Sequence, residues 1–509
     1  MTFTVVSSDI IGTANGVTLT TDDEILILEG VHVISTTGDG IYGSTSADNV
    51  DITVAGTVVG DNRGIMAFGD DITLTILETG SVIGTLEDAG TGALNFEGEN
   101  ASVTNYGTIL GSDMFGIFFG DPSATLNNSG QISGTSGVLL WDTDATIVNS
   151  GTIMGSANDR TDEFVDHGVV VRGGASVITN LDGGIIGTSS QDGSGVVIMS
   201  NLFGSEFTLN NFGQIVGDAY GFVNNSNSTI LVSDINNHGT ISGNVAGMQG
   251  GAGIEDVANS GLIGGDVNLG NGDDKLLNFG LIDGDVDLGG DDDIYRAIGD
   301  GAVAGSIVGG SGDDTLTGAS GEDEFFGDAG DDILRGADGD DVLFGGSDDD
   351  VLDGGVGDDV LYGEDDDDRL LGKAGEDVLF GGDGDDILRG DAGLDVLYGG
   401  AGSDRLFGGS GEDQFLFTSI TDSPNTNTDR DIIRDFEVGV DLIGVSQLSS
   451  PAFAFIGSAG FSGTAPELRA VVSAGGDTNV YLDTDGSGVA DMRILVSGVT
   501  TLTADDFIL

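Results

Sequence analysis

Twelve consecutive nonapeptides of the pattern GGxGxDxLx run without interruption through residues 309–416, and no other feature constrains the fold as strongly. Position one is Gly and position six is Asp in every unit, while position eight is Leu or, at Phe325 and Phe415, Phe. A short apolar segment repeated every nine residues cannot bury its inner face alone, so the units must stack on one another. We therefore predict a parallel β-roll in which two nonapeptides complete one coil, and units i and i+2 lie on top of each other.

The position-six aspartates are candidate calcium ligands. Calcium is a hard cation that takes six to eight oxygens from carboxylates and backbone carbonyls, and glycine permits tight turns that direct carbonyls inward. Stacked turns that share an ion would hold about ten ions at most. The candidate aspartates are Asp314, Asp323, Asp332, Asp341, Asp350, Asp359, Asp368, Asp377, Asp386, Asp395, Asp404 and Asp413, and the candidate glycines are Gly309, Gly327, Gly345, Gly354, Gly381 and Gly399.

The charge of the chain also points to bound cations. The 509 residues include 86 Asp and Glu against 14 Lys and Arg, a formal net charge of -72, and a compact fold would repel itself at that charge. An apolar content of 38% argues against general disorder. We expect the nonapeptide region to be unfolded at cytosolic calcium levels and to fold at extracellular levels, because stacked carboxylates need a counterion. We do not expect nucleic acid or anionic membranes as partners, because both need clustered Lys and Arg that this chain lacks.

In these nonapeptides the chain resembles the RTX, or hemolysin-type calcium-binding repeat, family, and this resemblance implies a secreted calcium-binding protein. Several units depart from the pattern and are expected to bind calcium more weakly. Position four is Asp at Asp348 and Asp366, and position two is not Gly at Ala319, Asp328, Ala337, Glu364, Lys373 and Asp391.

A second, looser repeat occupies roughly residues 30–290. Its unit is N-x-G-x-I-x-G, as in the segments that start at Asn105, Asn127, Asn149, Asn211, Asn237, Asn259 and Asn278, with two further short apolar runs between copies. Three short strands per repeat, separated by Gly or Asn, predict a three-sided parallel β-helix. At each coil corner the Asn is expected to supply left-handed backbone angles and a side-chain ladder. The copies from Asn259 and Asn278 end in acidic loops and grade into the nonapeptide type.

The segment from about residue 420 to 509 resembles the C-terminal module of serralysin-type RTX proteins, which implies an uncleaved signal for a type I secretion system. The first residues show no basic segment followed by an apolar run, so we expect no Sec signal peptide. Within this module DTDGSGVAD is similar to a DxDGxG calcium loop, with Asp483, Asp485 and Asp491 as candidate ligands. An acidic hairpin turn explains the same residues equally well.

Catalytic chemistry has little support in the sequence. The motif HExxH is absent and the histidines are His32, His167 and His238, which excludes a serralysin-like metalloprotease. A β-helix joined to an RTX roll resembles mannuronan C5-epimerases and β-helical lyases, although the epimerase motif YGFDPH is absent. The weak catalytic candidates are Asp166, His167 and Arg172, in a charged segment that also contains Asp159, Arg160 and Asp162.

These observations predict an all-β chain in three parts: a parallel β-helix over 1–300, a calcium-binding β-roll over 301–417 and a small β module over 418–509. We expect a secreted protein, extracellular or attached to the cell surface, without membrane insertion. Its expected partners are calcium and the type I secretion machinery, with cell-surface or matrix polysaccharide as a further candidate. The predicted role of the β-helix is that of an adhesin or structural surface module, and the alternative is a polysaccharide-modifying enzyme such as a uronan lyase or C5-epimerase.

Overall fold

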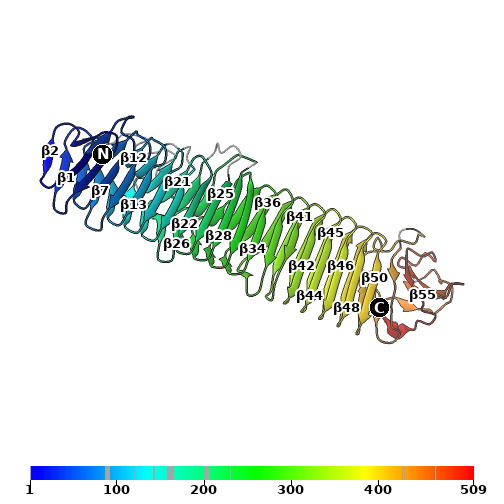
Figure 1. Ribbon diagram of the computed structural model, residues 1–509. Helices are drawn as coiled ribbons and strands as arrows, with labels where there is room; N and C mark the ends of the chain where they lie inside the picture. Colours follow the sequence, from blue (N-terminus) through cyan, green and yellow to red (C-terminus); the bar gives the residue numbers. More distant parts are fainter. Residues whose placement is uncertain are drawn as a thin grey trace. The chain divides into compact units, whose positions relative to one another are not determined.

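The computed structural model describes residues 2–509 except 86–91, 121, 142–143, 157–165, 200–205, 230, 427, 429 and 465. The described residues are mainly β-strands, which can be followed along the ribbon in Figure 1. They group into two compact units, Met1–Asp287 (unit 1) and Leu288–Leu509 (unit 2). The one helix among them is a single 3-10 turn, η1 (Ala504–Asp506). No helix in this described part is long and apolar enough to cross a membrane. The predicted all-β fold class is confirmed.

Each coil of unit 1 contributes one short strand to each of three sheets, and successive coils pair in parallel. The first sheet contains β1 (Thr2–Val6), β4 (Asp23–Ile27), β7 (Asp51–Val54), β10 (Thr73–Ile76), β13 (Ser102–Asn105), β16 (Thr125–Asn128), β19 (Thr146–Asn149), β22 (Ser176–Asn180), β25 (Glu206–Asn211), β28 (Val232–Asn237), β31 (Ile254–Asn259) and β34 (Lys275–Asn278). The second contains β2 (Ile10–Gly12), β5 (His32–Ser35), β8 (Thr57–Gly60), β11 (Ser81–Gly84), β14 (Thr108–Gly111), β17 (Gln131–Gly134), β20 (Thr152–Gly155), β23 (Ile185–Thr188), β26 (Gln214–Val216), β29 (Thr240–Ser242), β32 (Leu262–Gly264) and β35 (Leu281–Asp283). The third contains β3 (Val17–Leu19), β6 (Ile41–Gly43), β9 (Ile65–Ala67), β12 (Gly92–Phe96), β15 (Phe115–Phe119), β18 (Val138–Leu140), β21 (Val169–Val171), β24 (Val196–Ile198), β27 (Tyr220–Asn224), β30 (Ala246–Gln249) and β33 (Val267–Asn271). Unit 1 is therefore the predicted three-sided parallel β-helix.

The isoleucine of the N-x-G-x-I-x-G unit fills the core of this helix. Ile109, Ile132 and Ile153 are opposite one another on β14, β17 and β20, and each is at most 1% exposed. The motif glycine is required because successive corners approach closely: a Cβ at Gly130 would collide with the carbonyl oxygen of Gly107. The repeat thus encodes both the buried row and the distance between coils.

A ladder of buried asparagines runs along one corner of unit 1. In each step the side-chain Nδ2 of one Asn donates to Oδ1 of the next at 2.8–2.9 Å, through Asn105, Asn128, Asn149, Asn180, Asn211, Asn237, Asn259 and Asn278. The predicted ladder is confirmed, but the predicted left-handed backbone is wrong, because these residues have no positive φ. They lie at the ends of extended strands, and hydrogen bonds between their side chains join the corners of successive coils instead.

The roll of unit 2 has two sheets, because each nonapeptide gives one strand and one turn. One sheet contains β37 (Ile294–Ala297), β40 (Thr315–Thr317), β42 (Ile333–Asp338), β44 (Val351–Val356), β46 (Arg369–Ala374), β48 (Ile387–Ala392) and β50 (Arg405–Ser410). The other contains β39 (Ile307–Ser311), β41 (Glu324–Ala329), β43 (Val342–Ser347), β45 (Val360–Asp365), β47 (Val378–Asp383), β49 (Val396–Ala401) and β51 (Gln414–Leu416). Each strand pairs in parallel with the strand 18 residues away, for example at Leu352 and Leu370. Nonapeptides i and i+2 therefore stack as predicted. The position-eight side chains are 0% exposed and form the core.

Position nine of alternate nonapeptides builds an aromatic ladder on the outer face of the second sheet of the roll. Adjacent rings are stacked nearly parallel with centroids 4.6–4.8 Å apart, in the order Phe326, Phe344, Tyr362, Phe380 and Tyr398. The sequence analysis missed this ladder, although its 18-residue spacing is visible in the repeat. Rings of this kind stabilise each other beyond their buried area.

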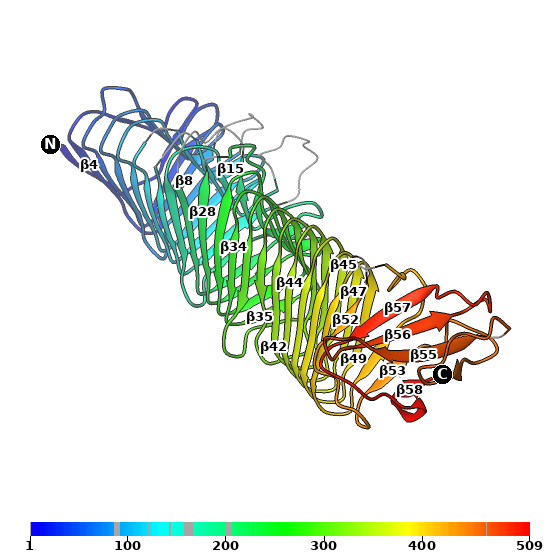
Figure 2. The ribbon, with the colours of Figure 1, turned by 90° about the vertical axis from the view of Figure 1, so that its right-hand side faces the viewer.

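The C-terminal segment continues the roll and then closes it. β52 (Ile432–Ile433) and β53 (Leu442–Gly444) pair in parallel with β50 and β51, and β58 (Phe507–Ile508) pairs with β53. The strands β54 (Ala454–Phe455), β55 (Glu467–Val472), β56 (Thr478–Asp483) and β57 (Met492–Val496) follow, and β55, β56 and β57 form the antiparallel sheet seen in Figure 2. The boundaries after residues 300 and 417, which divide the chain into β-helix, β-roll and C-terminal module, stay predictions.

Candidate metal sites in the roll

The turns between the roll strands use left-handed backbone angles at positions two and four. In the first nonapeptide, which starts at Gly309, these are Gly310, at φ 113°, and Gly312, at φ 129°. The departures from the pattern adopt the same conformation, at φ 72–89°: Asp328, Ala337, Asp348, Glu364, Asp366, Lys373 and Asp391. Ala319 differs and has no positive φ. The stack therefore imposes the turn even where a side chain is strained by it.

The twelve position-six aspartates form two columns, one for each row of turns. In the first ten aspartates the backbone N–H donates to Oδ1 of the aspartate 18 residues later, at 2.7–3.1 Å. The first column is Asp314, Asp332, Asp350, Asp368, Asp386 and Asp404, and the second is Asp323, Asp341, Asp359, Asp377, Asp395 and Asp413. The structure therefore brings all twelve predicted aspartates together at stacked turns.

The second carboxylate oxygen of these aspartates is buried and unpaired. Within the part of the chain that the structure describes, Oδ2 is buried without a hydrogen-bond partner in eleven of the twelve, and the exception, Asp323, is only partly buried. Each Oδ2 points back to the position-one glycine of its own turn, so that a Cβ there would collide with it, as at Gly309, Gly327, Gly345, Gly354, Gly381 and Gly399. An unpaired buried carboxylate oxygen costs several kcal/mol unless a cation binds it. That these glycines bind ions through their carbonyls stays a prediction.

Burial raises the pKa of these carboxyl groups far above the ordinary 3.8. The pKa of Asp341 rises to about 7 and that of Asp368 to about 8, chiefly because both lose contact with water. A backbone N–H lowers each pKa, and the neighbouring aspartates of the column raise it again; for Asp368 these are Asp386 and Asp350. A divalent cation would remove the repulsion and the desolvation penalty together. The donors are all hard oxygens, which fits calcium.

Both columns extend beyond the nonapeptides into the C-terminal segment. Oδ1 of Asp431 accepts from the N–H of Asp404, and Oδ1 of Asp441 accepts from the N–H of Asp413. Asp431 is fully buried, and its Oδ2 has no hydrogen-bond partner among the described residues. The sequence analysis missed both residues, although each starts an Asp-x-apolar triplet like positions six to eight.

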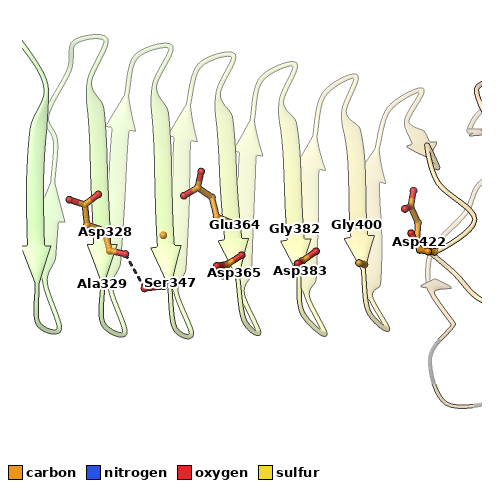
Figure 3. A pocket seen from close by; sticks show the side chains of 12 residues that line it. Asp328, Ala329, Ser347, Glu364, Asp365, Gly382, Asp383, Gly400 and Asp422 are labelled. Atoms are coloured by element: carbon orange, nitrogen blue, oxygen red, sulfur yellow. Dashed lines mark hydrogen bonds between the residues drawn. The ribbon is translucent and has the colours of Figure 1, made fainter.

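An acidic groove of about 900 Å³ follows one row of turns. It is lined by position-two and position-three residues of alternate units, including Asp328, Glu364, Asp365 and Asp383, and ends at Asp422. Figure 3 shows Asp328, Glu364, Asp365 and Asp383 at the ends of stacked strands of the roll. Such a lining attracts cations and repels anionic polymers.

The C-terminal candidates form a compact cluster. Asp483, Asp485 and Asp491 each offer a carboxylate oxygen within 4.8 Å of the others. Asp483 accepts hydrogen bonds from the N–H groups of Ser487 and Gly488, as expected for a tight turn. Both interpretations, calcium loop and acidic hairpin, remain open.

The weak catalytic candidates have structural partners. Nδ1 of His167 accepts a hydrogen bond from the N–H of Ser194 at 3.0 Å, and the Arg172 guanidinium lies 3.5 Å from the ring centroid of Trp141. Asp166 itself has a left-handed backbone conformation, at φ 72°. The other members of the charged segment, Asp159, Arg160 and Asp162, lie outside the described residues. A catalytic role for these residues stays a prediction.

Comparison with known proteins gives matches in the nonapeptide region. Residues 308–415 match the family model described as RTX calcium-binding nonapeptide repeat (4 copies) in overlapping segments. The solution structure of the AlgE6R3 subunit from the Azotobacter vinelandii mannuronan C5-epimerase is 34% identical, covers 29% of this chain and 80% of that chain, and has a TM-score of 0.24. The AlgE6R2 subunit of that enzyme is 32% identical, with coverages of 28% and 88% and a TM-score of 0.23. No curated protein sequence matches the chain.

Proposed function

We propose that this chain, whose residues 308–415 match the RTX calcium-binding nonapeptide repeat, is secreted and folds its roll when it meets calcium outside the cell. Calcium binding by the β-roll follows from the family and from the paired aspartate columns. The observation that carries the folding step is the set of eleven buried Oδ2 atoms without a hydrogen-bond partner among the described residues. Since those carboxylates cannot be both buried and charged without a cation, binding free energy becomes folding free energy.

Circular dichroism of the full chain in excess chelator and in millimolar calcium tests this proposal. We expect a large gain of β-structure on calcium addition, with hydrogen exchange of the amides in residues 309–416 slowed at least tenfold. Full β-content in excess chelator at neutral pH would contradict the proposal, because it would show that the columns are stable without ions.

Export is proposed to use the C-terminal module as a type I secretion signal. The support is the resemblance of residues 420–509 to serralysin-type modules, together with the acidic residues of η1 followed by the apolar ones of β58. Deleting residues 504–509 should abolish export by a type I transporter while the intracellular amount is retained. Unchanged export of the deletion variant would refute this part of the proposal.

Unit 1 is proposed to act as an adhesin or surface-structural module, which presents a repetitive surface instead of a catalytic pocket. Two depressions of about 270 and 290 Å³ in the described part of unit 1 are lined by residues such as Asp266, Asp285 and Gln249, or Phe212 and Gln214, with no Lys, Arg or His. A site for uronates needs a cation and an acid-base pair. The lining therefore supports binding through surface contacts over catalysis on acidic sugars.

The alternative proposal is a polysaccharide-modifying activity, favoured by His167 and the Arg172–Trp141 pair on adjoining coils. Incubating the calcium-loaded chain with alginate and pectate, and measuring unsaturated products and epimerised residues, separates the two proposals. Activity that His167→Ala abolishes would establish the enzyme and overturn the purely structural role. Absence of both products, with retained binding to a matrix or cell surface, supports the adhesin.

A further inference from the structure

The nonapeptide pattern continues in a degenerate form upstream of the matched repeats, inside unit 1. Residues 250–258 are GGAGIEDVA, which follow GGxGxDxLx except that position six is Glu255 and position eight is Val257. Residues 269–277 are LGNGDDKLL, with Asp274 at position six and Leu in place of Gly at position one. The two segments are one coil apart, so their position-six carboxylates belong to neighbouring coils.

The backbone of these two segments stacks as it does in the roll. The N–H of Glu255 donates to Oδ1 of Asp274 at 2.7 Å, the same bond that joins every pair of stacked aspartates in unit 2. Gly270 and Gly272 have left-handed angles, φ 102° and 121°, like positions two and four of the roll. A Cβ at either glycine would collide with a carbonyl oxygen of the preceding turn, so successive turns approach each other here as closely as they do in the roll.

Glu255 is an unusual residue for the interior of a β-helix. It lies on β31 opposite Ser233 of β28 and is 0% exposed. Its Oε1 accepts a hydrogen bond from Nδ2 of Asn224 at 2.5 Å, while Oε2 has no hydrogen-bond partner within the described ranges. Burial raises the pKa of Glu255 to about 7, although Asn224, the Gly251 backbone and Ser233 lower it. A carboxylate held this way needs either a proton or a cation.

We propose that Glu255 and Asp274 bind a divalent cation of the calcium type within unit 1, outside the recognised nonapeptides. The two side chains supply carboxylate oxygens, which calcium prefers. This inference rests on the proposed calcium-dependent folding of the roll, because it extends the same chemistry upstream. It makes the C-terminal coils of unit 1 calcium-dependent, so calcium would order part of the surface-presenting module as well as the roll.

The competing explanation is that Glu255 is a protonated acid without an ion, and the variant Glu255→Gln separates the two. Glutamine has the size and the neutral charge of the protonated acid, so it replaces that state at little cost, but it offers a cation only a neutral amide oxygen and no charge to balance it. Asp256→Asn is the matched control, because Asp256 is the next residue, is half exposed and forms a salt bridge with Lys275 at 3.4 Å. Glu255→Asp restores the pattern of the nonapeptide and should retain the ion.

Full-length protein is titrated with calcium alone, and hydrogen exchange is followed by mass spectrometry on peptides from residues 246–278 and, separately, 309–416. We expect calcium to slow exchange in 246–278 at least tenfold in wild type, Asp256→Asn and Glu255→Asp, and Glu255→Gln to lose this effect and about one bound ion in equilibrium dialysis. Identical protection and stoichiometry in Glu255→Gln would overturn the inference. A roll segment that fails to respond in the wild type would instead overturn the proposed function, so the two failures are distinguishable.

Discussion

Replacing Asp341 with asparagine should change the stability of the roll in opposite directions with and without calcium. Oδ1 of Asp341 accepts from the N–H of Asp323 at 2.8 Å, and its Oδ2 is buried without a hydrogen-bond partner among the described residues. Asparagine reproduces the size and the Oδ1 acceptor of the protonated acid but never carries charge. The matched control is Asp338→Asn in the same nonapeptide, because Asp338 is exposed.

The size of the effect follows from the pKa of Asp341. Burial raises that pKa from 3.8 to about 7 in the folded, metal-free roll. The folded state therefore binds a proton more tightly than the unfolded state, and this stability is present below pH about 4 and lost as the pH rises through about 7. One pKa unit is worth about 1.4 kcal/mol, so ionised Asp341 destabilises the metal-free roll by up to about 4 kcal/mol at pH 8. Near pH 6 the variant should recover up to about 3 kcal/mol.

The assay is acid-induced folding in excess chelator, followed by circular dichroism, together with a calcium titration at pH 7.5. In chelator we expect β-structure to appear as the pH falls, and to appear at a higher pH in Asp341→Asn than in wild type. In calcium we expect the variant to need at least about tenfold more calcium to fold, the change that 1.4 kcal/mol produces. Equal shifts in Asp338→Asn would refute the role of burial. Unchanged calcium dependence in Asp341→Asn would refute its role as a ligand.

Further substitutions, each of a residue outside the aspartate columns, test other parts of the fold. Tyr362→Ala should destabilise the calcium-loaded roll by about 1–3 kcal/mol in thermal unfolding, because its ring stacks on two neighbours at 4.8 Å. Asn180→Ala should cost unit 1 about 3 kcal/mol in urea unfolding, because it leaves buried ladder partners unpaired, while exposed Asn127→Ala should change stability by less than about 0.5 kcal/mol. Ala337→Gly should stabilise the calcium-loaded roll by about 1 kcal/mol, since φ at Ala337 is 89°, whereas Ala319→Gly, where φ is not positive, should destabilise it; equal effects would contradict the strain argument.

The periodicity of the sequence was sufficient to predict the coils, their cores and the aspartate columns. A side chain that recurs every 18 residues in stacked coils must lie above its copy, and this holds for Leu352 and Leu370 as for the position-six aspartates. The asparagine ladder was predictable for the same reason. Its backbone angles were not, because whether an Asn ends an extended strand or enters a left-handed turn depends on the neighbouring corner.

Residues outside a strict period were harder to predict. Asp431 and Asp441 join the columns 27 and 28 residues after their partners, because loops are inserted before each strand. Glu255 lies at the end of a series of coils of unequal length, where a one-residue shift would reverse the buried face of the strand. Only the paired strands identify the register of these residues.

The amino-acid sequence by itself determined that the roll must stack in pairs of nonapeptides and that its aspartates must lie in columns, since periodic apolar residues have no other way to be buried together. The tertiary structure decided which oxygen of each aspartate is left without a partner. One oxygen is taken by the N–H of the preceding coil and the other is turned toward a glycine in the same turn, as at Asp341 and Gly336. Which carboxylate oxygen bonds to the backbone and which is left unpaired depends on the distance between stacked turns. The unpaired oxygen is the physical reason that the roll needs a cation.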